Sequence, residues 1–406
     1  MRRIYSIVIE HWNYCIMYCN LIWLALGAFA IGTEGFMISG ILPGMARDLD
    51  VSVAKAGQLV TIFAFAYAVG SPLIAVATAN VPRKALLIGA MAAFTLSNLA
   101  AAFAPGYTAL AVARVLLALS AGTFMPASAG YASMTIAPNR RGRALSFIYS
   151  GMTIALVLGV PMGTLIAARF DWRATFMGVA ALSALALVGI IARLPGSPSP
   201  PPISLSRRLA VARRPDVLAV LVLTVLVLIG AFAVNTYFGA YLESVFKISP
   251  QGVALTLFVL GVAAAVGNTI GGHVADRWDK RQFLILATAM MVLSFAALSL
   301  LAAFAPAGWA FCGVIGAITV WALFGWSLPA VQQVRLLMID PHLAPVTLSL
   351  NSSAIYLGAA IGAVLGAATV QWTSLAMIGL VGAICELFAL GFLLLGRRGE
   401  QVIVPT

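Results

Sequence analysis

Glu34 is a carboxylate within an apolar run, Leu24 to Leu49, that is otherwise long enough to cross a lipid bilayer. A charged group at bilayer depth costs about 2.5–3.5 kcal/mol on insertion scales. Proteins keep such an acid where it binds an ion or a proton, or where a neighbouring helix supplies a structural partner. Both interpretations are open for this residue taken alone, and coupling to an ion or a proton is the first to test.

Arg114 is a second charge of this kind, in the segment AVARVLL at positions 111–117. Glu34 precedes the predicted end of its span by about seven residues, and Arg114 follows the predicted start of its span by about seven, so both lie about 10 Å below one surface. A carboxylate and a guanidinium at equal depth can pair, which lowers the cost of each charge. For Glu386, a third charge inside an apolar run, we expect a structural or lipid-interface role.

The composition indicates that lipid is the solvent of this chain. Its 406 residues are 62% hydrophobic and 9% charged, with a mean hydropathy of +1.03, whereas soluble proteins average about 45–50% apolar and 25% charged residues. The net charge of +12 does not indicate nucleic-acid binding, because the basic residues sit in short clusters between apolar runs. The four cysteines and three histidines lack the spacing of a disulfide framework or a metal site.

Twelve apolar runs are each long enough to cross about 30 Å of hydrocarbon. We therefore predict an all-α integral membrane protein with twelve transmembrane helices. The predicted spans are 19–41, 55–79, 84–104, 107–134, 144–168, 174–194, 216–241, 250–275, 282–304, 307–333, 345–370 and 374–396.

The basic residues predict the orientation, because positive charge favours the cytoplasmic side. The odd-numbered gaps between spans hold only five of the 24 basic residues, namely Arg47, Lys55, Arg169, Arg173 and Lys247. The others, Arg114 excepted, lie in the even-numbered gaps or at the two ends. Both termini are therefore expected in the cytoplasm, in agreement with the even number of spans.

The two halves repeat each other, which favours a pseudo-symmetric pair of six-helix bundles. Gly122 and Pro126 recur as Gly325 and Pro329 after 203 residues. Such duplication is typical of transporters with a midplane site between their repeats. The predicted parts are an N-terminal segment of unassigned role (1–18), the first bundle (19–194), a Pro- and Ser-rich cytoplasmic linker (195–215), the second bundle (216–396) and a cytoplasmic tail (397–406).

With these features the chain resembles the major facilitator superfamily, and within it the twelve-span drug:proton antiporters and sugar or arabinose efflux-like permeases. The segment Gly32–Phe36 with Leu42-Pro43, followed by Asp48-Leu49, is similar to that group's opening signature. Asp171–Phe176, DWRATF, is similar to its pattern between spans 5 and 6. The resemblance implies the major facilitator fold, and it links the span 4 arginine, Arg114, to proton coupling through Glu34.

The resemblance also implies an inner gate at the loop between spans 8 and 9. There Gly272, Asp276, Arg277, Lys280 and Arg281 match the family's pattern G-x-x-x-D-R-x-x-[RK]-[RK]. In the family the acid pairs with a base and a helix N-terminus, and the base expected here is Arg335. The aligned positions of the first half are Ala79 and Ala132, so one latch of two is expected to remain.

Span 5 carries a pattern similar to the antiporter signature of the efflux branch, with Thr164 where glycine is common. Glycines let helices touch, and a proline bends a helix by removing a backbone hydrogen bond. The signature residues are Gly151, Gly159, Pro161 and Gly163. Candidates for a substrate cavity, each of which could equally serve packing, are Tyr67, Asn235, Tyr237, Trp321 and Trp326.

The function expected from these features and from the resemblance is secondary active transport. We expect a proton-coupled efflux antiporter that exports a small organic solute (a sugar, nucleoside or drug) by alternating access, as a monomer in the bacterial inner membrane. The alternatives are a proton-coupled uptake symporter and a non-transporting membrane sensor. No nucleophile–base pair or phosphate loop indicates an enzyme. The expected partners are the solute, protons and membrane lipid, with no cofactor, metal or nucleic acid.

Overall fold

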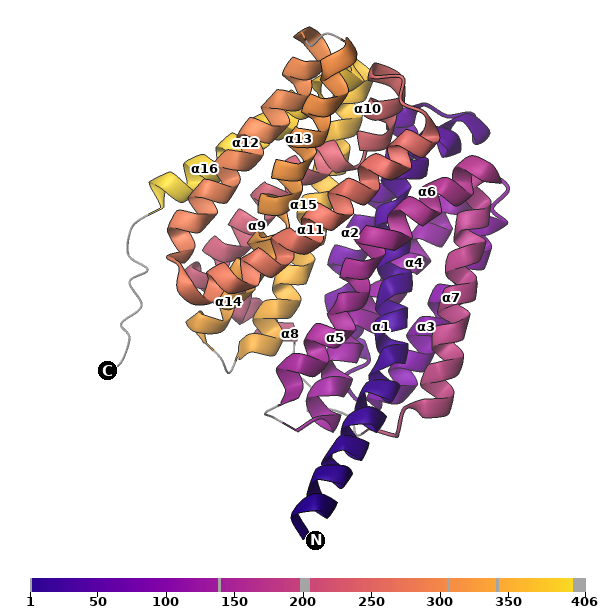
Figure 1. Cartoon of the computed structure of the whole chain (residues 1–406), viewed down its shortest axis with the longest axis vertical. Helices are drawn as coiled ribbons and strands as arrows, with labels where there is room; N and C mark the ends of the chain where they lie inside the picture. Colours follow the sequence, from indigo (N-terminus) through magenta and orange to yellow (C-terminus); the bar gives the residue numbers. More distant parts are fainter. Residues whose placement is uncertain (1, 138–139, 198–204, 305–306, 341–342, 397–406) are drawn as a thin grey trace.

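The protein is a bundle of twelve membrane-spanning helices, as predicted (Figure 1). A computed structural model describes residues 2–137, 140–197, 205–304, 307–340 and 343–396. Its helices are α1 (Arg2–Asp48), α2 (Val53–Ala77), α3 (Arg83–Ala102), α4 (Tyr107–Thr135), α5 (Arg141–Ile154), α6 (Val160–Arg169), α7 (Trp172–Arg193), α8 (Leu205–Ala212), α9 (Pro215–Asn235), α10 (Phe238–Val245), α11 (Pro250–Arg277), α12 (Lys280–Phe304), α13 (Ala307–Gly325), α14 (Leu328–Ile339), α15 (Ala344–Trp372) and α16 (Ile378–Leu395).

Three of the spans consist of two α-helices. Span 5 joins α5 to α6 through a π-helical turn, Ala155–Gly159, which lies directly before the Val160-Pro161 start of α6. Because proline cannot donate a backbone hydrogen bond, the local ladder must widen or break there. Span 7 joins α9 to α10, and span 10 joins α13 to α14, which begins Leu328-Pro329.

The predicted span ends agree with the structure to within a few residues, except in spans 1 and 10. Span 1 extends to Asp48 and span 10 to Ile339, whereas the apolar runs predicted ends at 41 and 333. Each extension carries basic residues that fit at a membrane surface, Arg47 in span 1 and Arg335 in span 10. Residues 2–19 are helical and continue α1 beyond the bundle (Figure 1).

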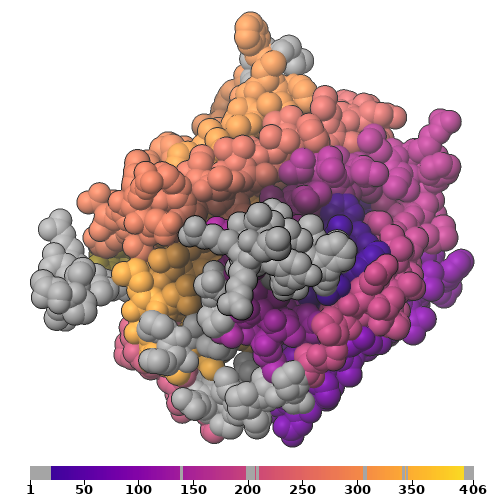
Figure 2. Space-filling view, turned by 60° about the horizontal axis from the view of Figure 1, so that its bottom comes forward, coloured from indigo at the N-terminus to yellow at the C-terminus, as the bar shows by residue number. Residues whose placement is uncertain are grey.

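The two halves are packed alike, which confirms the predicted duplication. Gly159 of span 5 leaves room for Thr33 of span 1, and its counterpart Gly362 of span 11 leaves room for Ile229 of span 7. A Cβ atom at either glycine would overlap the facing helix. Figure 2 views the bundle with the bottom of Figure 1 turned forward, and the first half, indigo to magenta, lies beside the second, salmon to yellow.

One end of the bundle carries the even-numbered gaps and the described parts of the linker, and we call it the linker end. There a lysine or arginine of each half binds the carbonyl end of that half's last span. Lys84 Nζ donates to Ile191 O at 3.1 Å, and Arg281 Nη2 donates to Leu393 O at 2.8 Å. Basic side chains are favourable at the C-terminal end of a helix. Arg281, predicted as part of an inner gate, thus holds the end of α16.

Candidate functional site

Glu34 of α1 and Arg114 of α4 form an ion pair in the interior of the first half. Arg114 Nη1 donates to Glu34 Oε1, and neither side chain has any exposed surface. The equal depth inferred from the sequence is thus matched by direct contact. Removing one partner of a buried pair costs about 3–5 kcal/mol, because it leaves an uncompensated charge.

α2 orients the arginine of this pair. Arg114 Nε donates to the Leu59 carbonyl oxygen at 3.3 Å. The guanidinium carbon lies 4.3 Å from the centre of the Phe63 ring, over its face. A cation over an aromatic face is stabilised by the ring quadrupole. The guanidinium is therefore held from two sides, by the carboxylate of α1 and by α2.

Each partner of the pair keeps one polar atom without a hydrogen bond. These atoms are Glu34 Oε2 and Arg114 Nη2, both buried. Buried polar atoms without partners are uncommon, and they often occur where a group serves function. An unbonded carboxylate oxygen can accept a proton, so the geometry leaves a proton-accepting atom beside a fixed cation.

The glycines of span 5 fix the position of α1, which carries Glu34. At Gly151 an added Cβ would overlap the Ala25 carbonyl oxygen, and at Gly159 it would overlap Thr33 Oγ1, next to Glu34. At Gly163 it would lie 3.2 Å from Thr175 Cγ2 of span 6 and 3.4 Å from Met37 Cβ of span 1. The predicted signature residues therefore allow close contact of span 5 with span 1 over several turns, and the π-helical turn lies within this contact.

An aromatic cluster joins the ion pair to the second half of the protein. Tyr67 of α2 stacks on Tyr356 of α15, with ring centres 3.6 Å apart and planes at 22°. The centre of the Phe63 ring lies 6.2 Å from that of Tyr356 and 6.3 Å from that of Tyr67. Phe63 thus contacts both the guanidinium and the opposite half. Sequence reasoning selected Tyr67 but missed Phe63 and Tyr356, because no spacing links position 356 to span 2.

The other predicted cavity residues differ in their surroundings. Tyr237 is fully buried and donates to the Ala363 carbonyl oxygen at 3.1 Å. Trp321 is 4% exposed and packs edge-on against Phe238 and Phe295. Asn235 and Trp326 are partly exposed, and Trp326 meets Phe36 of α1 at 5.5 Å. In this conformation Tyr237 and Trp321 are buried against neighbouring helices, and Trp326 contacts the other half.

The residues predicted as an inner gate lie at the linker end of the bundle. Asp276 is exposed, as are Gly272 and Arg277. Both Asp276 and Arg335 are described, and no ion pair joins them. Arg335 Nη1 instead donates to Gln332 Oε1 at 2.9 Å. Gln332 belongs to a buried polar network of three helices, since its amide donates to Thr224 Oγ1 at 3.2 Å and Thr224 donates to Asn351 Oδ1.

At the opposite end of the bundle, the two halves are in contact. Arg47, in the last turn of α1, pairs with Glu243 of α10 at 2.6 Å. Below this pair α10 lies directly on α1, because a Cβ at Gly239 would overlap the Ser39 carbonyl oxygen. Nearby within the first half, Asp48 accepts hydrogen bonds from both Trp172 and Arg173. The opening signature, which ends at Asp48-Leu49, and the Asp171–Phe176 segment thus meet at this end.

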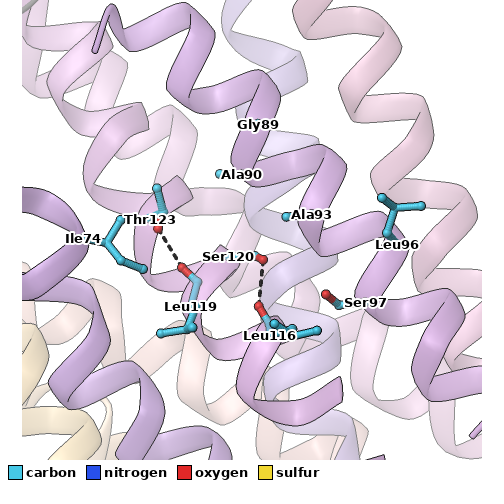
Figure 3. A pocket seen from close by; sticks show the side chains of 10 residues that line it. All are labelled: Ile74, Gly89, Ala90, Ala93, Leu96, Ser97, Leu116, Leu119, Ser120 and Thr123. Atoms are coloured by element: carbon cyan, nitrogen blue, oxygen red, sulfur yellow. Dashed lines mark hydrogen bonds between the residues drawn. The ribbon is translucent and has the colours of Figure 1, made fainter. Parts of the chain in front are cut away.

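A separate groove of about 460 Å³ lies between α2, α3 and α4 (Figure 3). No charged side chain lines it, and the Ser120 and Thr123 hydroxyls donate to carbonyls of their own helix, at Leu116 and Leu119. Such a groove suits hydrocarbon better than a polar solute. Within the described part of the chain, no three His, Cys, Asp or Glu side chains gather closely enough to hold a metal ion.

The model of the Major Facilitator Superfamily matches residues 24–334 and 220–405 of this chain. The chain belongs to this superfamily. The chain is 31% identical to the uncharacterized MFS-type transporter YbcL of Bacillus subtilis, over 90% of this chain and 93% of that protein. It is 30% identical to the inner membrane transport protein YdhP of Escherichia coli K12, over 95% and 97% of the two chains.

Two further comparisons bear on relatives and fold. A probable sugar efflux transporter of Mannheimia succiniciproducens is 28% identical, over 91% of each chain. Among solved structures, a D-xylose-proton symporter superposes with a TM-score of 0.73 at 16% identity, covering 92% of this chain and 97% of that one. The second similarity shows the shared fold alone. Together with twelve spans, these relatives place this facilitator-superfamily transporter in a membrane.

Proposed function

We propose that this transporter is a proton-coupled antiporter that exports a small organic solute from the bacterial cytoplasm. The observation that carries the proposal is the buried Glu34–Arg114 pair with its unbonded carboxylate oxygen. An intramembrane acid that has a partner and a free oxygen suits reversible protonation better than a purely structural role. The linker end is proposed to face the cytoplasm, because it carries the excess of positive charge.

In the proposed mechanism, a proton binds Glu34 Oε2 and neutralises the carboxylate. Arg114 then loses its charged partner and keeps its contacts with Leu59 and Phe63. A shift of the guanidinium changes the position of Phe63, and through it the Tyr67–Tyr356 contact between the halves. Protonation can therefore bias which end of the bundle is closed. Release of the proton restores the pair and resets the cycle.

The conformation described is proposed to be the one closed on the outside. The Arg47–Glu243 pair and the close contact of α10 with α1 seal the end opposite the linker. In the outward-open state we expect Asp276 and Arg335 to pair and Arg335 to leave Gln332. The inner gate would then alternate with the outer contact, as alternating access requires. Lys280 and Arg277 would remain surface charges of this loop.

Export is favoured over uptake by the span 5 signature and by the name of the sugar efflux relative. A proton-coupled uptake symporter is the second candidate, because one fold can serve either direction. Solute accumulation driven by a proton gradient would occur in inverted vesicles for an exporter. It would occur in right-side-out vesicles for a symporter.

A transport screen tests the function itself. Sugars, nucleosides, chloramphenicol-like drugs and amino-acid derivatives would be loaded into an efflux-deficient strain that expresses the chain. The proposal predicts that at least one compound leaves the cells faster than from the same strain without the protein, and that an uncoupler removes the difference. Efflux that persists unchanged with the uncoupler would contradict proton coupling. Binding of a compound without any flux in liposomes would favour a sensor.

Cross-linking the outer contact is expected to stop transport. Arg47 and Glu243 are joined by a 2.6 Å ion pair between partly exposed side chains, so R47C/E243C should react with a short bifunctional thiol reagent in a background without other cysteines. The cross-linked protein would be fixed closed at this end, and solute efflux should fall to the level of the empty strain. If the reagent contains a disulfide bond, reducing that bond should restore efflux. Full efflux by the cross-linked protein would contradict closure at this contact.

Tyr356 is expected to matter through its ring rather than its hydroxyl. Y356A removes the stacking with Tyr67, worth about 0.5–1.5 kcal/mol beyond buried area, and it separates Phe63 from the second half. We expect Y356A to lower the maximal efflux rate about tenfold and to shift its dependence on pH, while Y356F keeps both. Equal loss in Y356A and Y356F would contradict a role of the stacked ring.

A further inference from the structure

Glu386 lies in the middle of α16, far from the Glu34–Arg114 pair in sequence and in the other half of the protein. The α16 helix runs from Ile378 to Leu395, so Glu386 is more than two turns from either end. Its side chain has no exposed surface. Neither carboxylate oxygen has a hydrogen-bond partner.

A notch between α9 and α16 holds this carboxyl group. Gly230 of α9 faces it, and a Cβ added there would lie 2.7 Å from Glu386 Oε1 and 3.0 Å from the Gly382 carbonyl oxygen. Gly382, one turn before Glu386, lets α16 approach Val234 of α9. The two glycines therefore make room for a carboxyl group at a helix crossing where any larger residue would exclude it.

No cation faces this notch from the helices packed around it. The titratable or charged residues of α9, α12, α15 and α16, besides Glu386, are Asp216, Lys280, Arg281, Tyr356 and Cys385. Asp216 is in the first turn of α9 and Lys280 is the first residue of α12, both at the linker end. Arg281 binds the Leu393 carbonyl, which is about 10 Å along the helix from position 386.

A carboxylate without a cation or a hydrogen-bond donor is far more costly in this surrounding than a neutral carboxylic acid. We propose that Glu386 is a second proton-binding site, occupied in the conformation described, and that its neutral form lets α9 pack closely against α16. The bound species is a proton rather than a metal ion, because one carboxyl in an apolar notch offers too few ligands for a cation.

The neutral Glu386 side chain would hold span 7 in place, because it keeps α9 packed against α16. The α9 helix ends at Asn235, and the following α10 reaches the other half at Ser39 and Arg47. Loss of the Glu386 proton would place a charge in the notch, and water could reach it only if α9 and α16 separate. The packing of α9, which positions α10 against the first half, would then weaken. The inference does not depend on proton-coupled transport, because it concerns packing within one half.

Infrared spectroscopy of the purified full chain tests the protonation state directly, since a carboxylic acid has a carbonyl stretch that a carboxylate lacks. We expect a band equal to one buried carboxylic acid at neutral pH, present in the wild type and in E34Q and absent in E386Q. An infrared spectrum that E386Q leaves unchanged in this region would overturn the proposal, whatever the outcome of transport assays.

Thermal unfolding in detergent gives a second readout. A group that is protonated in the folded protein and ionised in the unfolded chain stabilises the fold fully below pH of about 4, and less as the pH rises. The wild-type Tm should therefore fall relative to that of E386Q between pH 5 and pH 8. A wild-type Tm that rises relative to E386Q over this range would indicate a charged Glu386 and overturn the proposal.

A matched pair of variants tests the notch between α9 and α16. G230A should lower the Tm by about 2–3 °C, because the added methyl group meets Oε1 and a backbone carbonyl. In the G230A/E386A double variant, the methyl group can occupy part of the vacated space, so G230A should cost less than half as much there. Equal costs of G230A with and without the Glu386 side chain would show that the notch does not hold the carboxyl group.

Discussion

Glu34→Gln is expected to abolish proton-driven efflux with a smaller loss of stability than Arg114→Leu, because the glutamine oxygen can still accept a hydrogen bond from the uncompensated guanidinium. Glutamine has nearly the shape of the buried Glu34 side chain and can still accept a hydrogen bond from Arg114 Nη1, but it cannot bind and release a proton. Efflux of a solute identified by the screen should fall to the level of cells without the protein. The measurement is the initial efflux rate with and without an uncoupler, at matched protein amounts in the membrane.

The matched control for this variant is Glu386→Gln, the other buried acid within a span. It also replaces a carboxyl by an amide, and because glutamine imitates the neutral form proposed for Glu386 and keeps α9 packed on α16, we expect it to retain most of the efflux. If Glu34→Gln exported the solute at the normal rate in a gradient-dependent manner, Glu34 would not be the coupling group. Asp48 is a less suitable control, because it accepts hydrogen bonds from Trp172 and Arg173 at the end of the bundle opposite the linker.

Arg114→Leu is expected to cause the largest loss of stability. The variant leaves the Glu34 carboxylate fully buried with no cation, at a cost of about 3–5 kcal/mol, or on the order of 5 °C in Tm. It also removes the contacts to Leu59 and Phe63. Lowering the pH should reduce the loss, because a protonated Glu34 no longer needs the cation. Thermal unfolding in detergent between pH 5 and pH 8 measures both effects.

The double variant Glu34→Leu/Arg114→Leu separates the charge from the packing. Replacing both members of a buried pair by apolar residues is often neutral or stabilising, so its Tm should recover most of the loss and should not depend on pH in the same way. Transport should remain absent, because no proton-binding group is left at this position. A double variant as unstable as Arg114→Leu would attribute the loss to packing rather than to an unpaired charge.

The fold was predictable because every span is an apolar run bounded by basic or turn-forming residues. Bilayer thickness fixes the length of such runs, and the distribution of Lys84, Arg281 and similar residues separates the two surfaces. Less predictable were the places where a span changes helical type. Pro161 indicates a bend, yet nothing in the sequence distinguishes the π-helical turn before it from an ordinary kink. The break between α9 and α10 has no proline to mark it.

The site was predictable only as far as depth could be inferred. Glu34 and Arg114 stand out because charge is rare in a membrane, and equal depth suggested that they pair. Tyr356 and Phe63 carry no such signal, because aromatic residues are ordinary in apolar spans. Their role comes from contact between helices about 290 residues apart in the chain. A long-range contact of this kind depends on tertiary packing, which hydrophobic periodicity does not encode.

The inner gate illustrates another limit of reasoning from motifs. Asp276 and Arg335 were predicted to pair, but a motif does not state in which conformation its contacts form. In the conformation described, Asp276 is exposed and Arg335 donates to Gln332, while the outer residues Arg47 and Glu243 pair instead. Glu243 and Arg47 are 196 residues apart, and single surface charges give no indication of their partners. The inner pair stays a prediction for the opposite conformation.

The most direct test of the central claim follows protons and solute together. Inverted vesicles that contain the protein would be acidified inside by respiration and followed with a pH-sensitive dye. Addition of the exported solute should raise the internal pH in wild-type vesicles and leave it unchanged in Glu34→Gln vesicles, because exchange at Glu34 moves protons outward as solute enters. Solute entry without any pH change in wild type, or an equal pH change in Glu34→Gln, would contradict proton coupling at this pair.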